Sequence, residues 1–131
     1  MAESELNIMC FNGTQPTDEA SQLKSFIDRN YHRDLSIRDI AGSIFRSNDY
    51  ANKLFKQCYG MTPYAYYIDV KIANAKALLL HTSLSIHQIS ENLGYKNDQY
   101  FSKQFHKIVG VTATHYRMES REDTVASNKK D

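Results

Sequence analysis

The sequence predicts an all-α protein of about seven helices. Apolar residues recur at spacings of three and four along most of the chain, and short polar residues suited to helix N-caps precede several of these stretches. The alternating Val, Ile and Thr runs typical of strands are missing. Since 41% of the 131 residues are hydrophobic and 24% are charged, the chain can form a folded core. No apolar run approaches the roughly 18 residues of a membrane span.

The first three helices are marked by their caps and apolar faces. A first helix fits residues 18–31, where two acidic residues precede an apolar stripe. A second begins after Ser36, which stands at capping-box spacing from Asp39. A third covers about 48–59 and ends before Gly60, as helices commonly end before glycine.

A longer fourth helix is expected at about 63–80. Thr62 is its expected cap, and Pro63 occupies the first position, where a missing N–H costs nothing. Its inner stripe begins with Tyr64. A fifth helix follows Ser85, again at capping-box spacing.

A sixth helix spans about 98–109, with Phe101, Phe105 and Ile108 expected to face inward. Thr112 caps a short last helix.

The expected domain covers residues 18–118. Residues 1–17 have little periodicity and indicate a flexible tail or the remnant of a linker, and the polar residues 119–131 indicate a second tail. The expected layout of the domain is a first helix-turn-helix at about 36–59, a linker helix at about 63–80 and a second helix-turn-helix at about 85–109.

The net charge of +1 hides an uneven distribution. Residues 1–20 carry four acids and no Lys or Arg, residues 21–117 carry thirteen bases and seven acids, and residues 118–131 carry three bases and four acids. A basic middle suggests a polyanionic partner. The N-terminus lacks the pattern of a signal peptide, so the expected compartment is the cytoplasm.

One stretch of the sequence occurs twice. LSIRDIAGSIFRSNDYANKLFKQCYGMT begins at Leu35, and LSIHQISENLGYKNDQYFSKQFHKIVGVT begins at Leu84. The offset is 49 before the turn between the helices and 50 after it, so the second copy carries one extra residue in that turn. Each copy is a capped short helix, a tight turn and a second helix, which is the outline of a helix-turn-helix.

In such a unit the outward face of the second helix can enter the DNA major groove while its inward face packs on the core. Asn and Gln can form two hydrogen bonds to adenine, and Lys can donate to guanine or to phosphate. Two such units in one chain would present two reading helices to successive turns of the duplex. The outward positions are Asp49, Asn52, Lys53, Lys56 and Gln57 in the first copy, and Asp98, Gln99, Ser102, Lys103, His106 and Lys107 in the second.

These residues resemble the AraC/XylS family of bacterial transcription regulators. The resemblance covers about residues 20–117 and is carried by the motifs Leu54-Phe55-Lys56, Gly60-Met61-Thr62-Pro63, Gly94-Tyr95, Tyr100-Phe101 and Tyr116-Arg117. Three departures from the family pattern are Phe45 in place of a usual glycine, Lys71 in place of an arginine, and His106 in place of a lysine.

The resemblance implies a function and a set of contacts. It implies sequence-specific binding of promoter or operator DNA in the bacterial nucleoid, activation more often than repression, contact with RNA polymerase, and in many members a sensory domain before this one. It implies that Asp49, Asn52, Lys53, Gln99, Ser102 and Lys103 read bases. It implies that Ser47, Lys56, Thr62, Lys96, Asn97, His106, Lys107 and Thr112 face the DNA backbone, the two threonines through the N–H groups of the helices that follow them.

Two other classes of function remain as alternatives. An enzyme is disfavoured because the sequence contains no phosphate-binding loop, no GxGxxG and no HExxH motif. No cofactor is expected, and the two cysteines, Cys10 and Cys58, have no metal-ligand spacing and are expected to be unpaired thiols. A helical protein-interaction module without DNA binding is the second alternative, since fold alone does not fix function.

Overall fold

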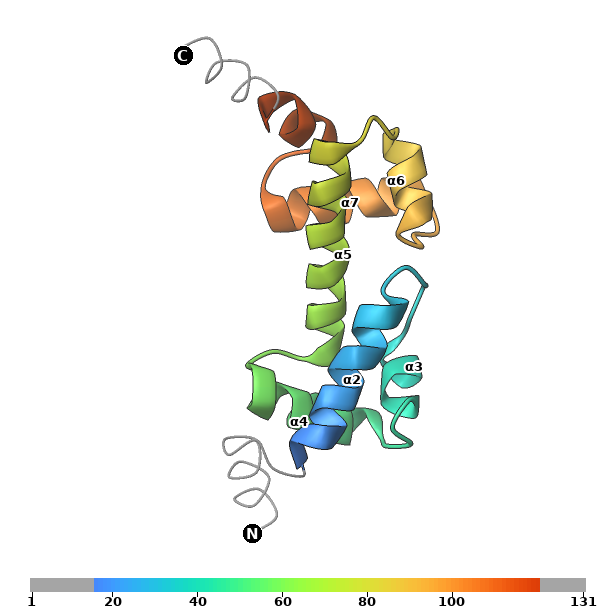
Figure 1. Ribbon diagram of the computed structural model, residues 1–131, viewed down its shortest axis with the longest axis vertical. Helices are drawn as coiled ribbons and strands as arrows, with labels where there is room; N and C mark the ends of the chain where they lie inside the picture. The colour runs from blue at the N-terminus through green and yellow to red at the C-terminus, as the bar shows by residue number, and fades with distance from the viewer. Residues whose placement is uncertain (1–15, 121–131) are drawn as a thin grey trace. The chain divides into compact units, whose positions relative to one another are not determined.

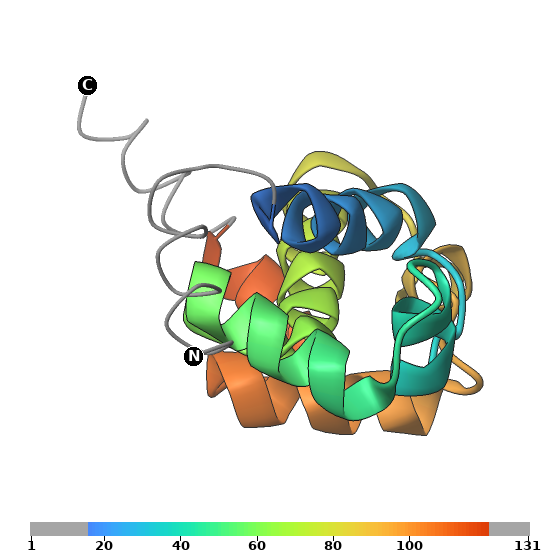
Figure 2. The same ribbon diagram turned by 90° about the horizontal axis from the view of Figure 1, so that it is seen from below.

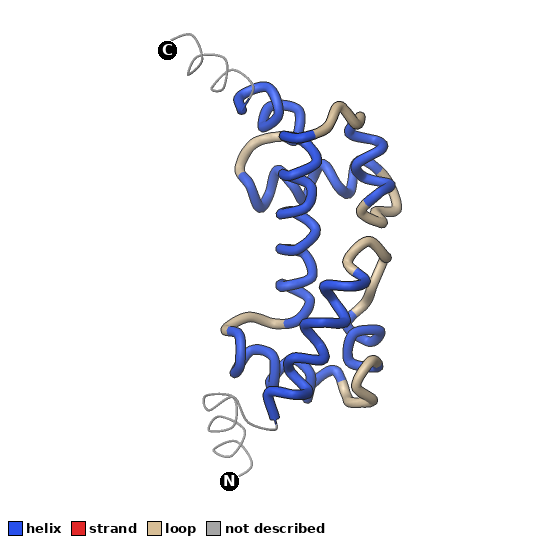
Figure 3. The backbone as a smooth tube through the Cα atoms, viewed as in Figure 1, coloured by secondary structure: helices blue, strands red, loops and turns tan. Residues whose placement is uncertain are grey.

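The computed structural model describes residues 16–120, and every regular element within that range is a helix (Figures 1 and 3). Six of them are α2 (Pro16–Asn30), α3 (Ile37–Gly42), α4 (Asn48–Tyr59), α5 (Pro63–His81), α6 (Ile86–Asn92) and α7 (Asp98–Val109). Residues 113–120 are also helical. The all-α prediction is therefore confirmed, with seven helical segments and no strand among the described residues.

The two helices α4 and α7 begin and end where the sequence predicted, because each has a cap at both ends. In α4 the Ser47 side chain accepts a hydrogen bond from the Tyr50 N–H at 3.1 Å, and Gly60 terminates the helix with a φ of 80°. In α7 Asn97 takes the serine's place, and Gly110 ends the helix with a φ of 95°. Such left-handed caps favour glycine, which lacks a Cβ.

The first helix begins at Pro16 and ends at Asn30, whereas the sequence predicted 18–31. Proline lacks a backbone N–H, and the first N–H groups of a helix have no partner within it, so a helix can begin at this residue. The expected tails at 1–17 and 119–131 lie outside the described residues except at their inner ends, which are helical.

The described chain divides into two compact units, and α5 contributes residues to both. The first unit contains the described residues up to Tyr31 together with Leu35–Val70, and the second contains His32–Asp34 and the chain from Lys71 onward. In the first unit α2, α3 and α4 contact one another (Figures 1 and 2). In the second unit α6 contacts α7.

The core of the first unit is formed by side chains from all of its helices. Its largest fully buried members are Leu23, Ile27, Ile40, Leu54, Phe55 and Tyr67. The hydroxyl of buried Tyr67 accepts a hydrogen bond from the Leu35 N–H at 3.0 Å, which fixes the chain just before α3.

The core of the second unit is formed around the aromatic residues of α7. Its buried apolar side chains are Ile72, Ala75, Leu79, Ile89, Leu93, Phe101, Phe105 and Ala113. Arg117 fastens the segment 113–120 to the end of α5, since its Nε donates to the Leu79 carbonyl at 2.9 Å and its Nη2 donates to the Thr82 carbonyl at 3.2 Å.

Three predictions about side chains are wrong. Tyr64 and Ile108 were expected to face inward, but they are 38% and 45% exposed. Each lies in a terminal turn of its helix, where fewer neighbours surround a side chain. Cys58 was expected to be an unpaired thiol but is disulfide-bonded, since spacing along the chain does not reveal which thiols a fold brings together. Cys10 lies outside the described residues.

Candidate nucleic-acid interface

The α4 helix presents a polar outer face in the first unit. Asp49, Lys53 and Lys56 are exposed and Asn52 is half-buried, while Ala51, Leu54 and Phe55 on the opposite side are fully buried. The core therefore fixes the rotation of the helix about its axis. Ser47 caps the helix, so its side-chain oxygen is engaged with the Tyr50 N–H, although its own O–H can still donate to an acceptor.

The α7 helix presents a corresponding face in the second unit. Phe101 and Phe105 are fully buried. Asn97 caps the helix by accepting from the Tyr100 N–H at 2.8 Å, which leaves its amide N–H groups free of that bond. The exposed predicted residues on this helix are Gln99, Ser102, Lys103, His106 and Lys107.

The chemistry of the two faces suits duplex DNA. Lys and Gln side chains reach base edges in the major groove, and Lys also pairs with phosphate. The two lysines at equivalent positions, Lys53 and Lys103, are both exposed, and neither forms an ion pair within residues 16–120. The first face contains one carboxylate, Asp49, which is also exposed and does not cap the helix, since Ser47 does.

The two predicted threonines each cap the start of a helix that follows a helix-turn-helix. Thr62 Oγ1 accepts from the Ala65 N–H at 3.2 Å, and Thr112 Oγ1 accepts from the His115 N–H at 3.1 Å. The remaining first-turn N–H groups of such helices form a partially positive end that favours an anion.

One candidate residue of the second unit, Lys96, has an acidic neighbour that the sequence did not indicate. Lys96 Nζ lies 3.6 Å from the carboxylate of Asp34, and both side chains are largely exposed. Exposed pairs of this kind are weak, so a DNA phosphate can compete with Asp34 for the ammonium group. The pairing joins residues 62 positions apart, which no local pattern predicts.

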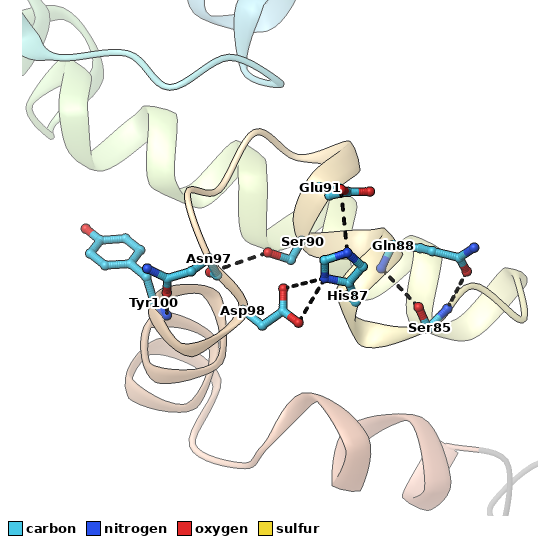
Figure 4. Close-up of polar contacts among 8 residues, drawn as sticks. All are labelled: Ser85, His87, Gln88, Ser90, Glu91, Asn97, Asp98 and Tyr100. Atoms are coloured by element: carbon cyan, nitrogen blue, oxygen red, sulfur yellow. Dashed lines mark hydrogen bonds and ion pairs between the residues drawn. The ribbon is translucent and has the colours of Figure 1, made fainter.

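Hydrogen bonds and ion pairs join α6 to the first turn of α7 (Figure 4). His87 Nδ1 lies 3.0 Å from both carboxylate oxygens of Asp98, and its Nε2 lies 3.5 Å from Glu91. The hydrogen bond to Asp98 and the two nearby negative charges raise the pKa of His87 above its ordinary value. Ser90 Oγ adds a long contact of 3.5 Å to the Asn97 carbonyl. These contacts orient the start of the candidate reading helix.

In the first unit a different cluster holds the turn before α4. Glu19 accepts hydrogen bonds from Arg46 Nε at 2.9 Å and from the Tyr50 hydroxyl at 2.7 Å, and the Arg46 guanidinium lies 4.5 Å from the centre of the Tyr50 ring. Burial alone would raise the pKa of Glu19, but the two hydrogen bonds outweigh it and lower the pKa. The bond to Glu19 raises the pKa of Tyr50.

In the second unit a buried lysine stabilises the corresponding turn, which lies between α6 and α7. Lys71 is 2% exposed, its Nζ donates to the Leu93 carbonyl at 2.7 Å, and it lies 4.3 Å from the centre of the Tyr95 ring. Burial lowers the pKa of Lys71 to about 8, and the charge of Asp34 partly opposes this. A lysine within the apolar stripe of α5 was the one available sequence signal for this role.

Other kinds of site are absent from the described residues. No group of three or more His, Cys, Asp or Glu residues between 16 and 120 is arranged to hold a metal ion. Over the same range no helix is long and apolar enough to cross a membrane.

Comparison with known proteins gives consistent matches. The profile of the helix-turn-helix domain family matches residues 40–119. The lactose operon transcription activator of Staphylococcus xylosus is 37% identical over 70% of this chain and 33% of its own length. The regulatory protein PocR of Salmonella typhimurium is 33% identical over 83% of this chain and 37% of its own length. The chain thus spans about a third of the length of these curated relatives.

Solved structures with the same fold include DNA-binding domains. The C-terminal domain of AraT, a response regulator from Geobacillus stearothermophilus, has a TM-score of 0.74 at 29% identity, covering 77% of this chain and 84% of that one. The DNA-binding domain of AdpA in complex with a target DNA also has a TM-score of 0.74, covering 79% and 94% of the two chains. Its identity is 16%, so this second likeness concerns the fold alone.

Proposed function

Because the chain belongs to the AraC/XylS family of helix-turn-helix transcription regulators, we propose that it reads double-stranded DNA with two helices placed in successive major grooves. The observation that carries the proposal is the repeated face: α4 and α7 are both capped, both packed through buried aromatics, and both polar outward. The family consists of DNA-binding regulators and not of enzymes.

We assign base reading to the central outward residues of each helix. In this assignment Lys53 and Lys103 donate to guanine, Asn52 and Gln99 bond adenine, and Ser102 accommodates several bases. Asp49 fits only where it accepts from the amino group of cytosine, because a carboxylate is repelled by phosphate.

We assign contacts with the DNA backbone to the residues at the edges of the two faces. Ser47 and Asn97 donate from the N-cap positions, and the helix starts after Thr62 and Thr112 offer backbone N–H groups. The basic or ionisable side chains in this group are Lys56, Lys96, His106 and Lys107.

The name of one relative, a lactose operon transcription activator, supports activation as the regulatory outcome. We therefore propose contact with RNA polymerase at a bacterial promoter, and action in the cytoplasm where the chromosome lies. Since the match covers only 33% and 37% of these two relatives, we also propose that a sensory domain precedes this segment in the intact regulator.

Selection of bound duplexes from a random DNA pool at near-physiological salt tests the proposal. Two reading helices predict an enriched motif of two short blocks about 10 base pairs apart. A single block would mean that one unit only holds the backbone. No enrichment over the input pool would favour the protein-interaction alternative.

Lysine substitutions then test the assignment of residues. We expect Lys53→Ala and Lys103→Ala each to weaken binding to the selected duplex by about 1–3 kcal/mol and to relax the preference at one base position. Arg29→Ala is the matched control, because this exposed residue of α2 removes the same charge outside both helix-turn-helix units. Unchanged affinity in both lysine variants would remove these residues from the reading set.

A further inference from the structure

The left-handed residue in the turn between α3 and α4 is a phenylalanine, although neither the backbone conformation nor packing within the unit favours one. Phe45 has a φ of 57° and is the positive-φ residue other than glycine among the described residues. A left-handed backbone is unfavourable for side chains with a Cβ, and for bulky ones most of all. The Phe45 side chain is also 94% exposed, so it buries almost no surface within the unit.

The backbone on both sides of Phe45 is well fixed. Its N–H donates to the Gly42 carbonyl at 3.1 Å, and the next N–H, of Arg46, donates to the Ala41 carbonyl at 3.2 Å. The Arg46 side chain is held in turn by Glu19 at 2.9 Å. The exposed ring therefore projects from an ordered turn.

The second copy of the unit shows how this turn is built without an exposed ring. Gly94 has a φ of 76°, and the following N–H, of Tyr95, donates to the Ser90 carbonyl at 3.1 Å, as Arg46 does to Ala41. Glycine adopts this conformation without strain. The first copy thus carries a phenylalanine at a position where its own repeat carries a relaxed glycine.

The position of Phe45 connects it to the candidate interface. Residues 45–49 form a continuous exposed run that leads into the outward face of α4. Phe45 precedes the N-cap Ser47 by two residues, so their Cα atoms are at most about 7 Å apart. That distance equals about two base-pair steps of a duplex, whose rise is about 3.4 Å.

We propose that Phe45 is a further DNA-contacting residue, whose ring packs against deoxyribose and thymine-methyl surface beside the nucleotides that the start of α4 contacts. The inference rests on the proposed function. The four residues after Phe45 in the exposed run are Arg46, Ser47, Asn48 and Asp49, which suit a polar groove better than the apolar centre of a protein–protein interface. Apolar contact with the thymine methyl is a recognised mode of base reading.

The test measures folding and DNA binding in the same variants. In Phe45→Gly we expect an unchanged or higher melting temperature, because the left-handed strain is removed, and about tenfold weaker binding to the selected duplex, because a buried aromatic contact is lost. The slope of log affinity against log salt should stay as in the wild type, since no phosphate contact is removed.

Two further variants separate the role of the ring from that of the backbone strain. Phe45→Leu retains an apolar side chain and the strain, whereas asparagine tolerates a left-handed backbone. Phe45→Leu should therefore bind DNA more tightly than Phe45→Asn without having a higher melting temperature. Replacing thymines by uracils in the flank of the first block should weaken wild-type binding and leave Phe45→Asn unaffected, because uracil lacks the methyl group.

The outcomes separate this inference from the proposed function. If the wild type selects a motif and all three variants bind it equally well, Phe45 does not contact DNA and the inference is overturned. Equal DNA binding with lost promoter activation in vitro would instead assign the ring to a protein contact, which also overturns it. A wild type that binds no duplex would refute the proposed function and the inference together.

Discussion

The first helix-turn-helix makes its turn with a phenylalanine that faces outward, whereas the second makes the same turn with a glycine covered by another segment. A Cβ at Gly94 would overlap the His32 carbonyl oxygen, while Phe45 is 94% exposed. The two turns nevertheless share the hydrogen bond that follows the left-handed residue, at 3.2 Å in the first and 3.1 Å in the second. The backbone of the turn is therefore conserved between the copies, and the surroundings decide which side chain it tolerates.

The two turns also differ in what supports them. Arg46 in the first turn pairs with Glu19 at a partly exposed site. In the second turn buried Lys71 holds the Leu93 carbonyl, and its ammonium lies against the Tyr95 ring. Exposed pairs contribute little, whereas breaking a buried polar contact is costly. The second turn should therefore be the more sensitive to substitution.

The largest effect is expected for Gly94→Ala. The methyl group would have to displace the backbone at His32, and the residue would also adopt a strained left-handed φ, so we expect the second unit to lose about 3 kcal/mol or more. Gly110→Ala is the control, since its φ is 95° but nothing lies within 4 Å of the added Cβ, and it should cost about 1–2 kcal/mol. Urea unfolding measures both. Equal losses of unfolding free energy in the two variants would show that the backbone at His32 moves aside with little loss of stability.

A pH effect of intermediate size is expected from Lys71. Its pKa is lowered to about 8 in the folded protein, against about 10.4 in an unfolded chain, so the folded unit binds fewer protons between these values. Stability should therefore rise with pH, by roughly 1–2 kcal/mol between pH 7.5 and 9.5. Lys71→Arg stays charged throughout and should lack this rise. If both proteins show the same pH profile, the ammonium group is better solvated than its burial indicates.

The cluster at Glu19 should contribute less. We expect the Glu19–Arg46 coupling in a double-mutant cycle of Glu19→Gln and Arg46→Met to be measurable but small at pH 7, because exposed ion pairs contribute little. Because the pKa of Glu19 is lowered on folding, its contribution is present above the pKa of an unfolded glutamate and is lost as the pH falls through the folded value. A coupling that persists at pH 2 would contradict this account.

The smallest effect is expected at His87, whose side chain is largely exposed. The hydrogen bond to Asp98 raises its pKa, so the contact favours folding below the ordinary histidine pKa and its benefit disappears as the pH rises through the raised value. An NMR titration of the imidazole should show a lower pKa in Asp98→Asn than in the wild type. An equal imidazole pKa in both proteins would show that the hydrogen bond between His87 and Asp98 does not form in solution.

The helices of the two units were predictable because their signals are local. The apolar spacing placed α4 and α7, and Gly60 and Gly110 end them as expected, while the N-caps Ser47 and Asn97 are seen in the structure. The outward faces followed from the same periodicity. Ile108 was misplaced because periodicity assigns a side of the helix but does not show how far the packing partner extends.

The supports of the two turns were not predictable, because they join distant parts of the sequence. Arg46 and Glu19 are 27 residues apart, and Lys71 and Leu93 are 22 apart. No sequence pattern near Arg46 or Lys71 indicates which distant residue it contacts. The exposure of Phe45 could not be predicted either, since a phenylalanine is ordinarily expected to pack inward.

The extra residue in the second turn has a consequence for exchanging recognition helices between the copies. The left-handed residues Phe45 and Gly94 are 49 positions apart, but the caps Ser47 and Asn97 are 50 apart. A chimera aligned on the turns would rotate the grafted helix by about 100° and place the counterpart of Lys103 at buried Leu54. Aligned on the caps, it would replace Lys53, so modular designs that transplant specificity from one copy to the other must take their register from the N-cap.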